Sequence, residues 1–259
     1  MGLGRRGKLA HDDAEWVFNR MADWYDARPE YPEALLHFLY GMVSAAPPRI
    51  LDVGAGIGHL ALPLARLGAR VTAVEPARAM LQRLVASAEG EGLTIEAHHT
   101  SAEVLPMRSV CVDLAVISDA IHFLDAELTA VELQRVLSPQ GVLCVIRAEH
   151  GDTPYMNSVV RIMEESAPRR PRETGYALKQ IGAMLGVEWE PPRVFDDETP
   201  MPFLQVERIL RSISYIGPAM HAARFAAFSE RIAAIPETPA WSRRLTVHVG
   251  RRPVRTPRR

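Results

Sequence analysis

Arg49-Ile-Leu-Asp-Val-Gly-Ala-Gly-Ile-Gly-His-Leu-Ala-Leu-Pro-Leu-Ala65 reads as a buried strand followed by a glycine-rich turn and the beginning of a helix. The apolar run at 50–53 has the length and composition of a parallel strand buried on both faces. Gly54, Gly56 and Gly58 follow, and glycines there let the backbone bend tightly and approach a ligand without a Cβ in the way. The segment is therefore predicted to be the first half of a βα nucleotide-binding unit.

The spacing of these glycines distinguishes two kinds of nucleotide site. A dinucleotide fingerprint, Gly-x-Gly-x-x-Gly, would require a third glycine where this chain has His59. The chain instead has Gly-x-Gly-x-Gly, preceded by the carboxylate of Asp52. An NAD(P)-dependent oxidoreductase is for this reason the less favoured interpretation.

Strand and helix patterns alternate along the chain around this unit. Such alternation at short intervals is typical of a doubly wound parallel sheet. The strand-like runs lie at 50–53, 70–74, 93–98, 112–117 and 142–146, with a weak candidate at 187–195 and an alternating, antiparallel candidate at 245–249. We therefore expect an α/β, Rossmann-like, mostly parallel seven-stranded sheet with helices on both faces.

A carboxylate ends the second predicted strand. Glu75 follows Gly54 by about 20 residues, the separation at which an acid at the end of the neighbouring strand accepts hydrogen bonds from a ribose diol. A surface acid at a strand end is the alternative interpretation. The glycine turn nearby favours the ribose.

Several segments, in order, resemble the class I S-adenosylmethionine (SAM)-dependent methyltransferases of the small-molecule type (methyltransferase type 11), which include quinone-biosynthesis and trans-aconitate enzymes. They are Asp52-Val-Gly-Ala-Gly-Ile-Gly58, Glu75-Pro-Ala-Arg-Ala-Met80, Ser101-Ala-Glu-Val-Leu-Pro106, Ser118-Asp-Ala-Ile-His-Phe123 and Leu137-Ser-Pro-Gln-Gly141, with weaker matches at Tyr25-Asp-Ala-Arg-Pro-Glu-Tyr-Pro32 and Arg211-Ser-Ile-Ser-Tyr215. The resemblance implies in-line methyl transfer from SAM to an oxygen, nitrogen or carbon nucleophile of a small molecule, for instance in secondary metabolism, with S-adenosylhomocysteine as the product.

The resemblance also implies where the cofactor lies. The backbone of Gly54 and Gly56 would hold its methionine portion, and the loop that carries Arg28 would close over that end. Ser101 stands where the family commonly has an aspartate for the adenine amino group, and a serine hydroxyl is a weaker acceptor. The residues expected to bind the cofactor are Asp52, Gly54, Ala55, Gly56, Gly58, Glu75, Pro76, Met80, Ser101, Ala102, Glu103, Ser118, Tyr25 and Arg28.

His122 is the first candidate for a catalytic group. It follows the fourth predicted strand, at the edge where ligands of open α/β sheets bind. Because histidine exchanges a proton near neutral pH, His122 is a candidate base or orienter of the acceptor, with a structural role at a helix start as the alternative. Tyr25 is a second candidate, and Tyr155 and His150 are further side chains expected beside the acceptor.

The domain organisation is expected to be one methyltransferase domain. Its parts are N-terminal cap helices at 12–44, a SAM-binding core at 45–150, a helical lid at 151–186, C-terminal helices with the last strand at 187–250, and disordered tails at 1–10 and 251–259. A substrate would enter between the cap helices and the lid.

Composition and charge restrict the classes of partner. The 259 residues carry a formal net charge of −1 and contain no apolar run of membrane-spanning length, so we expect a cytoplasmic protein without a membrane or nucleic-acid partner. Cys111 and Cys144 fall in or beside predicted buried strands, so neither a disulfide nor a metal site is expected. A peptide acceptor, a homo-oligomer and a non-catalytic or repurposed SAM-binding protein stay open as alternatives.

Overall fold

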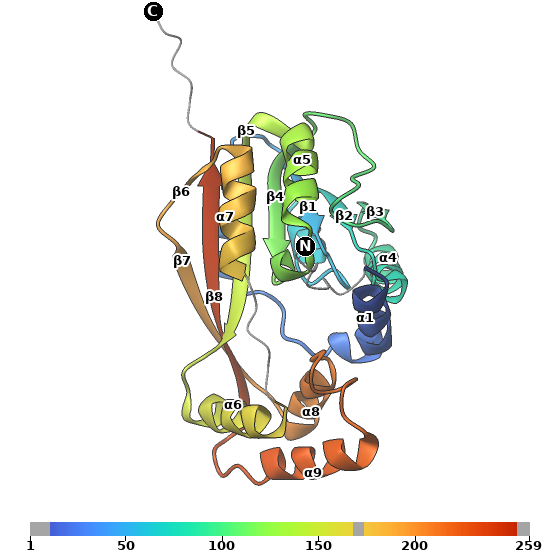
Figure 1. Cartoon of the computed structure of the whole chain (residues 1–259), viewed down its shortest axis with the longest axis vertical. Coiled ribbons are helices and arrows are strands. Elements are labelled where there is room, and N and C mark those ends of the chain that lie inside the picture. Colours follow the sequence, from blue (N-terminus) through green and yellow to red (C-terminus); the bar gives the residue numbers. More distant parts are fainter. Residues whose placement is uncertain (1–10, 168–173, 253–259) are drawn as a thin grey trace, which may run out of the picture.

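The computed structural model describes residues 11–167 and 174–252. It contains an eight-stranded sheet in the order β3-β2-β1-β4-β5-β8-β6, with β7 pairing along β8 (Figure 1). The strands are β1 Arg49–Val53, β2 Arg70–Val74, β3 Ile95–His98, β4 Val112–Ser118, β5 Leu137–His150, β6 Glu188–Trp189, β7 Arg193–Pro200 and β8 Ala240–Arg251. The helices are α1 His11–Tyr25, α2 Glu33–Tyr40, α3 Ala61–Arg66, α4 Arg78–Gly90, the 3₁₀ turn η1 Ile121–Phe123, α5 Ala126–Val136, α6 Pro154–Ser166, α7 Thr174–Leu185, α8 Phe203–Arg211 and α9 Ala222–Ala233.

The parallel part of the sheet, β1 to β5, confirms the doubly wound α/β prediction. β1 pairs in parallel with β2 on one side and with β4 on the other. Ile50 belongs to the apolar core beneath α2, α3 and α4, whereas its neighbour Leu51 belongs to the core beneath α5 and α7. Both side chains are buried, as expected for a parallel strand whose two faces are covered by helices.

The sheet has eight strands where the sequence predicts seven. The segment expected to form one strand at 187–195 forms two, and both β6 and β7 pair antiparallel with β8. Pro191 and Pro192 separate them. Because proline has no backbone N–H to donate to a ladder, this pair interrupts the strand.

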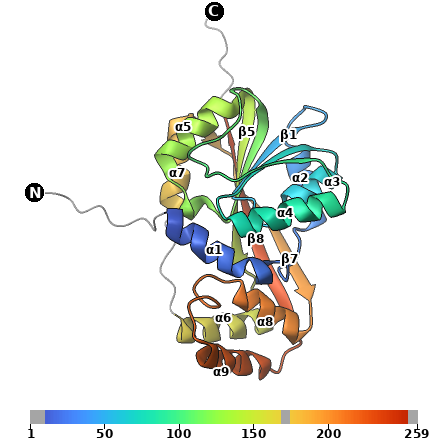
Figure 2. The same cartoon turned by 90° about the vertical axis from the view of Figure 1, so that its right-hand side faces the viewer.

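A helical lobe lies beyond one end of the sheet. β5, β7 and β8 are longer than the other strands and run into this lobe, where α6, α8 and α9 lie close together (Figures 1 and 2). These helices and β8 share one apolar core, which includes Met156, Val206, Phe225 and Trp241. α1 lies between the sheet and the lobe and packs on both α4 and α8.

The helical lid expected at 151–186 is two helices with different positions. α6 packs on α9 and β8 in the lobe, whereas α7 packs on α5 and η1 beside the sheet. Ile181 and Leu185 of α7 are part of the core on that face. Both helices have one apolar face, but that pattern does not specify the partner. α7 is therefore a sheet-covering helix and not a lid.

One further boundary differs from expectation. Arg251 was placed in a disordered tail, but it ends β8 opposite Val142, and its Nε lies 2.6 Å from a carboxylate oxygen of Glu190. The remaining predicted tails at 1–10 and 253–259 lie outside the described residues. Within the described ranges, no helix is long and apolar enough to cross a lipid bilayer.

Candidate active site

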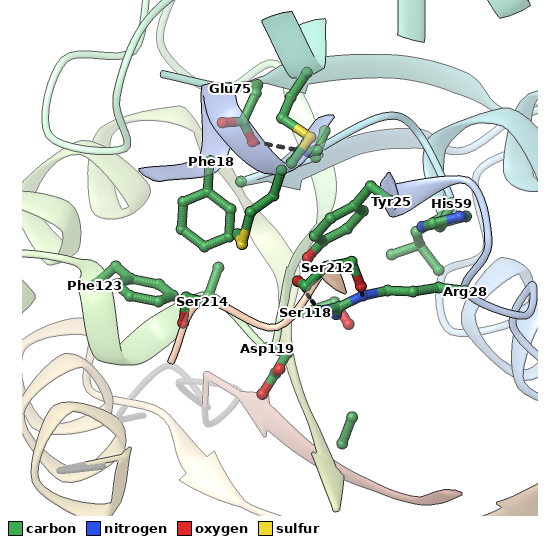
Figure 3. Close-up of a pocket in the computed structure, with 18 of the residues that line it drawn as sticks. Phe18, Tyr25, Arg28, His59, Glu75, Ser118, Asp119, Phe123, Ser212 and Ser214 are labelled. Carbon is green, nitrogen blue, oxygen red and sulfur yellow. Dashed lines mark hydrogen bonds between the residues drawn. The ribbon is translucent and has the colours of Figure 1, made fainter. Parts of the chain in front are cut away.

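A cavity of about 510 Å³ opens at the carboxyl ends of β1, β2 and β4. The turn after β1, the helix α1 and its following loop, η1 and the segment after α8 surround it (Figure 3). Ligands of open α/β sheets bind at this edge, where the chain winds in opposite directions from β1 and β4. The volume is that of a site for small ligands.

The turn after β1 brings backbone to the cavity wall. Gly54 has a φ of +72°, and a Cβ built there would lie 2.9 Å from the Cβ of Ala120. The amides of Gly54 and Ala55 donate to the carbonyl of Val74 at 2.9 and 3.1 Å, which fixes the turn against β2. Only glycine fits at position 54. Any other residue would be strained at this positive φ, and its Cβ would collide with the loop that carries Ala120.

Gly58 was predicted to bind the cofactor, but it does not line the cavity. A Cβ at Gly58 would lie 3.0 Å from side-chain atoms of Leu62 and Leu84, and its φ is +93°. This third glycine therefore allows the turn to pack against α3 and α4. The spacing alone did not separate a packing glycine from a ligand-facing one.

The carboxylate of Glu75 is held by two backbone amides. Its Oε2 accepts a hydrogen bond from Gly56 N at 2.8 Å, and its Oε1 accepts one from Ala77 N at 2.8 Å. The residue is buried at the end of β2 and lines the cavity. Because each carboxylate oxygen has more than one lone pair, Glu75 keeps acceptor capacity for hydroxyl groups of a ligand.

Asp52 is buried beside Glu75, with an exposed fraction of 2%. Burial and the charge of Glu75 raise the pKa of Asp52 to about 7, against the opposing effect of a hydrogen bond from the backbone of Ala61. Its Oδ2 is buried and has no hydrogen-bond partner among the residues that the structure describes. A buried acceptor of this kind on a cavity wall is suited to a ligand that brings a positive charge or a donor.

A second group of predicted residues lines the cavity beyond Glu75. It comprises Pro76, Met80, Ser101, Ala102 and Glu103. Met80 is buried and packs with Met21 of α1. One oxygen of Glu103 accepts a hydrogen bond from the amide of Asp125 at 2.7 Å, so this carboxylate also secures the beginning of α5.

Tyr25 lies beside the glycine turn, and Arg28 lies against the ring of Tyr25. The ring of Tyr25 stacks on His59 with centroids 5.8 Å apart, and the guanidinium of Arg28 lies 4.1 Å from the centroid of the Tyr25 ring. Figure 3 shows Arg28 directed toward Ser212, which lies at the end of α8. Both predicted residues therefore reach the cavity, and the contact with α8 is a feature that the sequence did not reveal.

Tyr31 is a cavity residue that the list of predicted site residues missed. Its hydroxyl lies 2.6 Å from Ser118 Oγ at the end of β4. Burial raises the pKa of Tyr31 to about 12, against the opposing effects of the Ser118 hydrogen bond and the charge of Arg243. The sequence feature that could have identified Tyr31 is its position in the family-like segment 25–32, from which only Tyr25 and Arg28 are predicted as site residues.

His122, the candidate catalytic group, also lines the cavity. His122 is in η1 and its ring centroid lies 4.0 Å from that of Phe123. Asp119, which was not predicted, also lines the cavity and has a φ of +46°, a conformation that few residues other than glycine and asparagine or aspartate adopt. His150 also lies at the cavity, as expected.

Tyr155 was expected near the acceptor, and the structure contradicts this. The residue is 3% exposed, lies in the apolar core of the helical lobe and does not line the cavity. No described residue of 151–186 lines it either. The corresponding wall is made instead by α8, by the residues that follow it and by β8, namely Ile209, Ser212, Ile213, Ser214, Tyr215, Trp241 and Arg243.

Comparison with known proteins finds similarity to methyltransferases. The family model described as a methyltransferase domain, Methyltransf_11, matches residues 51–145, which run from β1 into β5. An uncharacterized methyltransferase of Mycobacterium tuberculosis is 31% identical over 182 residues, covering 70% of this chain and 63% of that protein. The malonyl-acyl-carrier-protein O-methyltransferase of Geobacter sulfurreducens is 28% identical over 213 residues, covering 78% and 79%.

The solved structures show the same fold. The cyclase SpnF superposes with a TM-score of 0.62 at 18% identity, over 94% of this chain and 97% of that one. The sequence matches to the mycobacterial relatives are partial, since they span from 36% to 63% of the length of those proteins.

Proposed function

We propose that this chain is a class I SAM-dependent methyltransferase that transfers the methyl group of SAM to a small-molecule acceptor, supported by the methyltransferase-domain match at residues 51–145 and by the similarity to other methyltransferases. The observation that carries the proposal is the arrangement of Asp52, Glu75 and the turn at Gly54 and Gly56 around one cavity. These residues come from the ends of adjacent parallel strands. Each offers a group that a different part of SAM requires.

The residues fit this cofactor on two counts. Asp52 Oδ2 is buried on the cavity wall without a described partner, and the α-ammonium group of SAM would supply one. Glu75 holds its carboxylate rigidly through Gly56 and Ala77 and keeps lone pairs for the ribose diol. Ser101 and Ala102 would face the adenine, as the resemblance implies.

In this mechanism the main task of the protein is to orient the acceptor relative to the cofactor. SAM supplies a methyl group already activated on a sulfonium, so the chemical driving force belongs to the cofactor. The chain has to hold the acceptor in line with the breaking bond and exclude water, and such orientation contributes up to about 7–11 kcal/mol. Tyr25, Ser118 and the segment after α8 wall the cavity and would do this.

His122 is the residue that we propose to orient or deprotonate the acceptor. It lies at the same cavity as Ser118 and Asp119, at the carboxyl end of β4. An imidazole exchanges a proton near neutral pH and suits an acceptor that loses a proton on methylation. An acceptor that is already anionic would need His122 only as a hydrogen-bond partner.

The shape of the site supports a small acceptor. Its volume of about 510 Å³ has to hold both cofactor and acceptor, and residues of α1, α8 and β8 are part of its lining. A pocket of this size suits an acceptor of modest size or the end of a longer molecule. Oxygen, nitrogen and carbon acceptors all fit the proposal.

The experiment that tests the proposal is calorimetric titration of the purified protein with S-adenosylhomocysteine, with NADH as a parallel control. We expect micromolar binding of S-adenosylhomocysteine and none of NADH. Binding of NADH alone would favour the oxidoreductase alternative. Binding of S-adenosylhomocysteine without SAM turnover over a broad acceptor screen would favour a repurposed SAM-binding protein, and SpnF is a cyclase on the same fold.

A further inference from the structure

Arg28 and Ser212 make a two-point contact between segments that are far apart in the sequence. Arg28 Nε donates to Ser212 Oγ at 2.8 Å, and Arg28 Nη2 donates to the Ser212 carbonyl at 2.8 Å (Figure 3). The Ser212 hydroxyl in turn donates to the carbonyl of Ile209 at 2.7 Å. Ser212 is fully buried, so its hydroxyl has one fixed orientation. The hydroxyl proton is directed at the Ile209 carbonyl, and a lone pair of the oxygen is directed at Arg28 Nε.

The position of Ser212 in α8 strengthens this contact. Ser212 is the C-cap of α8, and the carbonyl end of a helix carries a partial negative charge that favours a cation. Ser212 is therefore suited to hold a guanidinium without cancelling its charge, because neither of its two acceptors is ionised.

The charge of Arg28 is left without a carboxylate inside the described part of the chain. Its hydrogen bonds go to a hydroxyl and a carbonyl, and its face lies on the ring of Tyr25. The other arginine at the cavity differs, since Arg243 pairs with Asp197 and also donates to the backbone of Pro29 and Glu30. Arg28 is accordingly the cavity cation that a ligand carboxylate would meet.

Tyr25 is a neighbour of both the glycine turn and Arg28. A Cβ built on Gly56 would lie 3.8 Å from the ring of Tyr25, and Arg28 lies on that same ring. Burial, together with the charges of Arg28 and Arg243, lowers the pKa of His59 to about 4. A neutral His59 adds no second cation that would compete for an anion.

We propose that Ser212 is a positioning residue that holds the Arg28 guanidinium against the glycine turn, so that its free edge binds the carboxylate of the cofactor's methionine portion. The inference rests on the proposed function, because that carboxylate belongs to SAM. It makes the helical lobe, through α8, part of the cofactor site. Cofactor affinity is then coupled to the position of α8.

The test compares two ligands that differ in the amino-acid portion. S-adenosylhomocysteine has the carboxylate, whereas 5′-methylthioadenosine has the adenosine and the thioether but no amino-acid portion. Calorimetry on the wild type, Ser212→Ala and the control Ser229→Ala measures both dissociation constants. Ser229 is a buried serine of α9 in the same lobe, away from the cavity lining.

We expect Ser212→Ala to weaken S-adenosylhomocysteine binding about fivefold or more, the effect of losing one hydrogen bond to a charged group, and to leave 5′-methylthioadenosine binding within about twofold. Ser229→Ala should change neither. A purely structural role would weaken both ligands alike, and that result, or no change in either, overturns the proposal for Ser212. A wild type that binds neither ligand overturns the proposed function itself.

A second variant keeps the test decisive if Ser212→Ala does not fold. Arg28→Lys retains the charge but cannot reach the Ser212 hydroxyl and carbonyl together, because an ammonium lacks the fork of a guanidinium. The proposal requires that this variant also lose affinity for S-adenosylhomocysteine while keeping its affinity for 5′-methylthioadenosine. Equal affinity of Arg28→Lys and wild type for S-adenosylhomocysteine would overturn it.

Discussion

Glu75 Oε2 accepts a hydrogen bond from the backbone amide of Gly56 at 2.8 Å, so the end of β2 and the turn after β1 are one unit. The other oxygen of Glu75 holds the amide of Ala77 before α4. A single carboxylate therefore ties together the parts of the chain that are proposed to surround the ribose and the methionine portion of SAM. Its removal should affect both ligand binding and the turn itself.

Glu75→Ala is expected to weaken S-adenosylhomocysteine binding by about 1–3 kcal/mol, the cost of leaving buried hydroxyl and amide groups without their acceptor. Calorimetric titration measures the change. Glu164→Ala, which removes an exposed carboxylate of α6, is the matched control and should bind as the wild type does. Unchanged affinity of Glu75→Ala would remove Glu75 from the cofactor site.

Asp52 should make the ligand-free protein less stable as the pH rises from about 4 to about 7. Its folded-state pKa is raised to about 7 from an ordinary value of 3.8, chiefly by burial. In that interval the folded state binds more protons than the unfolded state, so the free energy of unfolding falls with rising pH. Melting temperatures measured across this interval should drop by several degrees more in the wild type than in Asp52→Asn.

The Asp52→Asn variant is the control for all other titrating groups, because it keeps the shape of the side chain and removes only its ionisation. Parallel melting curves for the two proteins over the whole interval would show that Asp52 titrates at an ordinary pKa. The Oδ2 of Asp52 would then have to be solvated in the ligand-free state.

His122→Ala should leave the affinity for S-adenosylhomocysteine close to that of the wild type and lower the turnover of SAM with an acceptor. The physical reason is position, because His122 lines the cavity from η1, and none of the cofactor contacts proposed here comes from η1. Calorimetry and a turnover assay separate the two effects. A large fall in melting temperature would instead assign His122 a structural role.

Tyr31→Phe is expected to reduce the free energy of unfolding by about 1 kcal/mol, because it removes the hydroxyl that lies 2.6 Å from Ser118 Oγ. A double-mutant cycle with Ser118→Ala measures the coupling by chemical denaturation. Residues that share a hydrogen bond typically show a coupling of about 0.5–3 kcal/mol. Additive effects of the two substitutions would mean that the pair contributes nothing to stability.

The glycine turn and the parallel strands could be predicted because their signals are local. Ile50 and Leu51 alternate between two apolar cores that both exclude water, so the strand has to be apolar throughout, and this is visible in the residues themselves. Asp52 and Glu75 were found because both lie at fixed distances from the same glycine turn. Gly58 shows the limit of such spacing, since it serves packing against Leu62 and Leu84.

The helical lobe could not be assigned in the same way. α6 and α7 have similar amphipathic patterns, but one packs on α9 and the other on α5. Tyr155 was expected at the acceptor and is instead buried in the lobe. An amphipathic pattern reports that one face is buried and does not report which surface covers it.

The amino-acid sequence by itself determined the βα unit, the alternation of strands and helices, and the family resemblance, because each depends on residues close together in the chain. The tertiary structure decided which distant residues share the cavity. Arg28 and Ser212 are 184 positions apart, and no local pattern connects them. Their contact exists because β5, β7 and β8 extend past the sheet and carry α8 to the loop that follows α1.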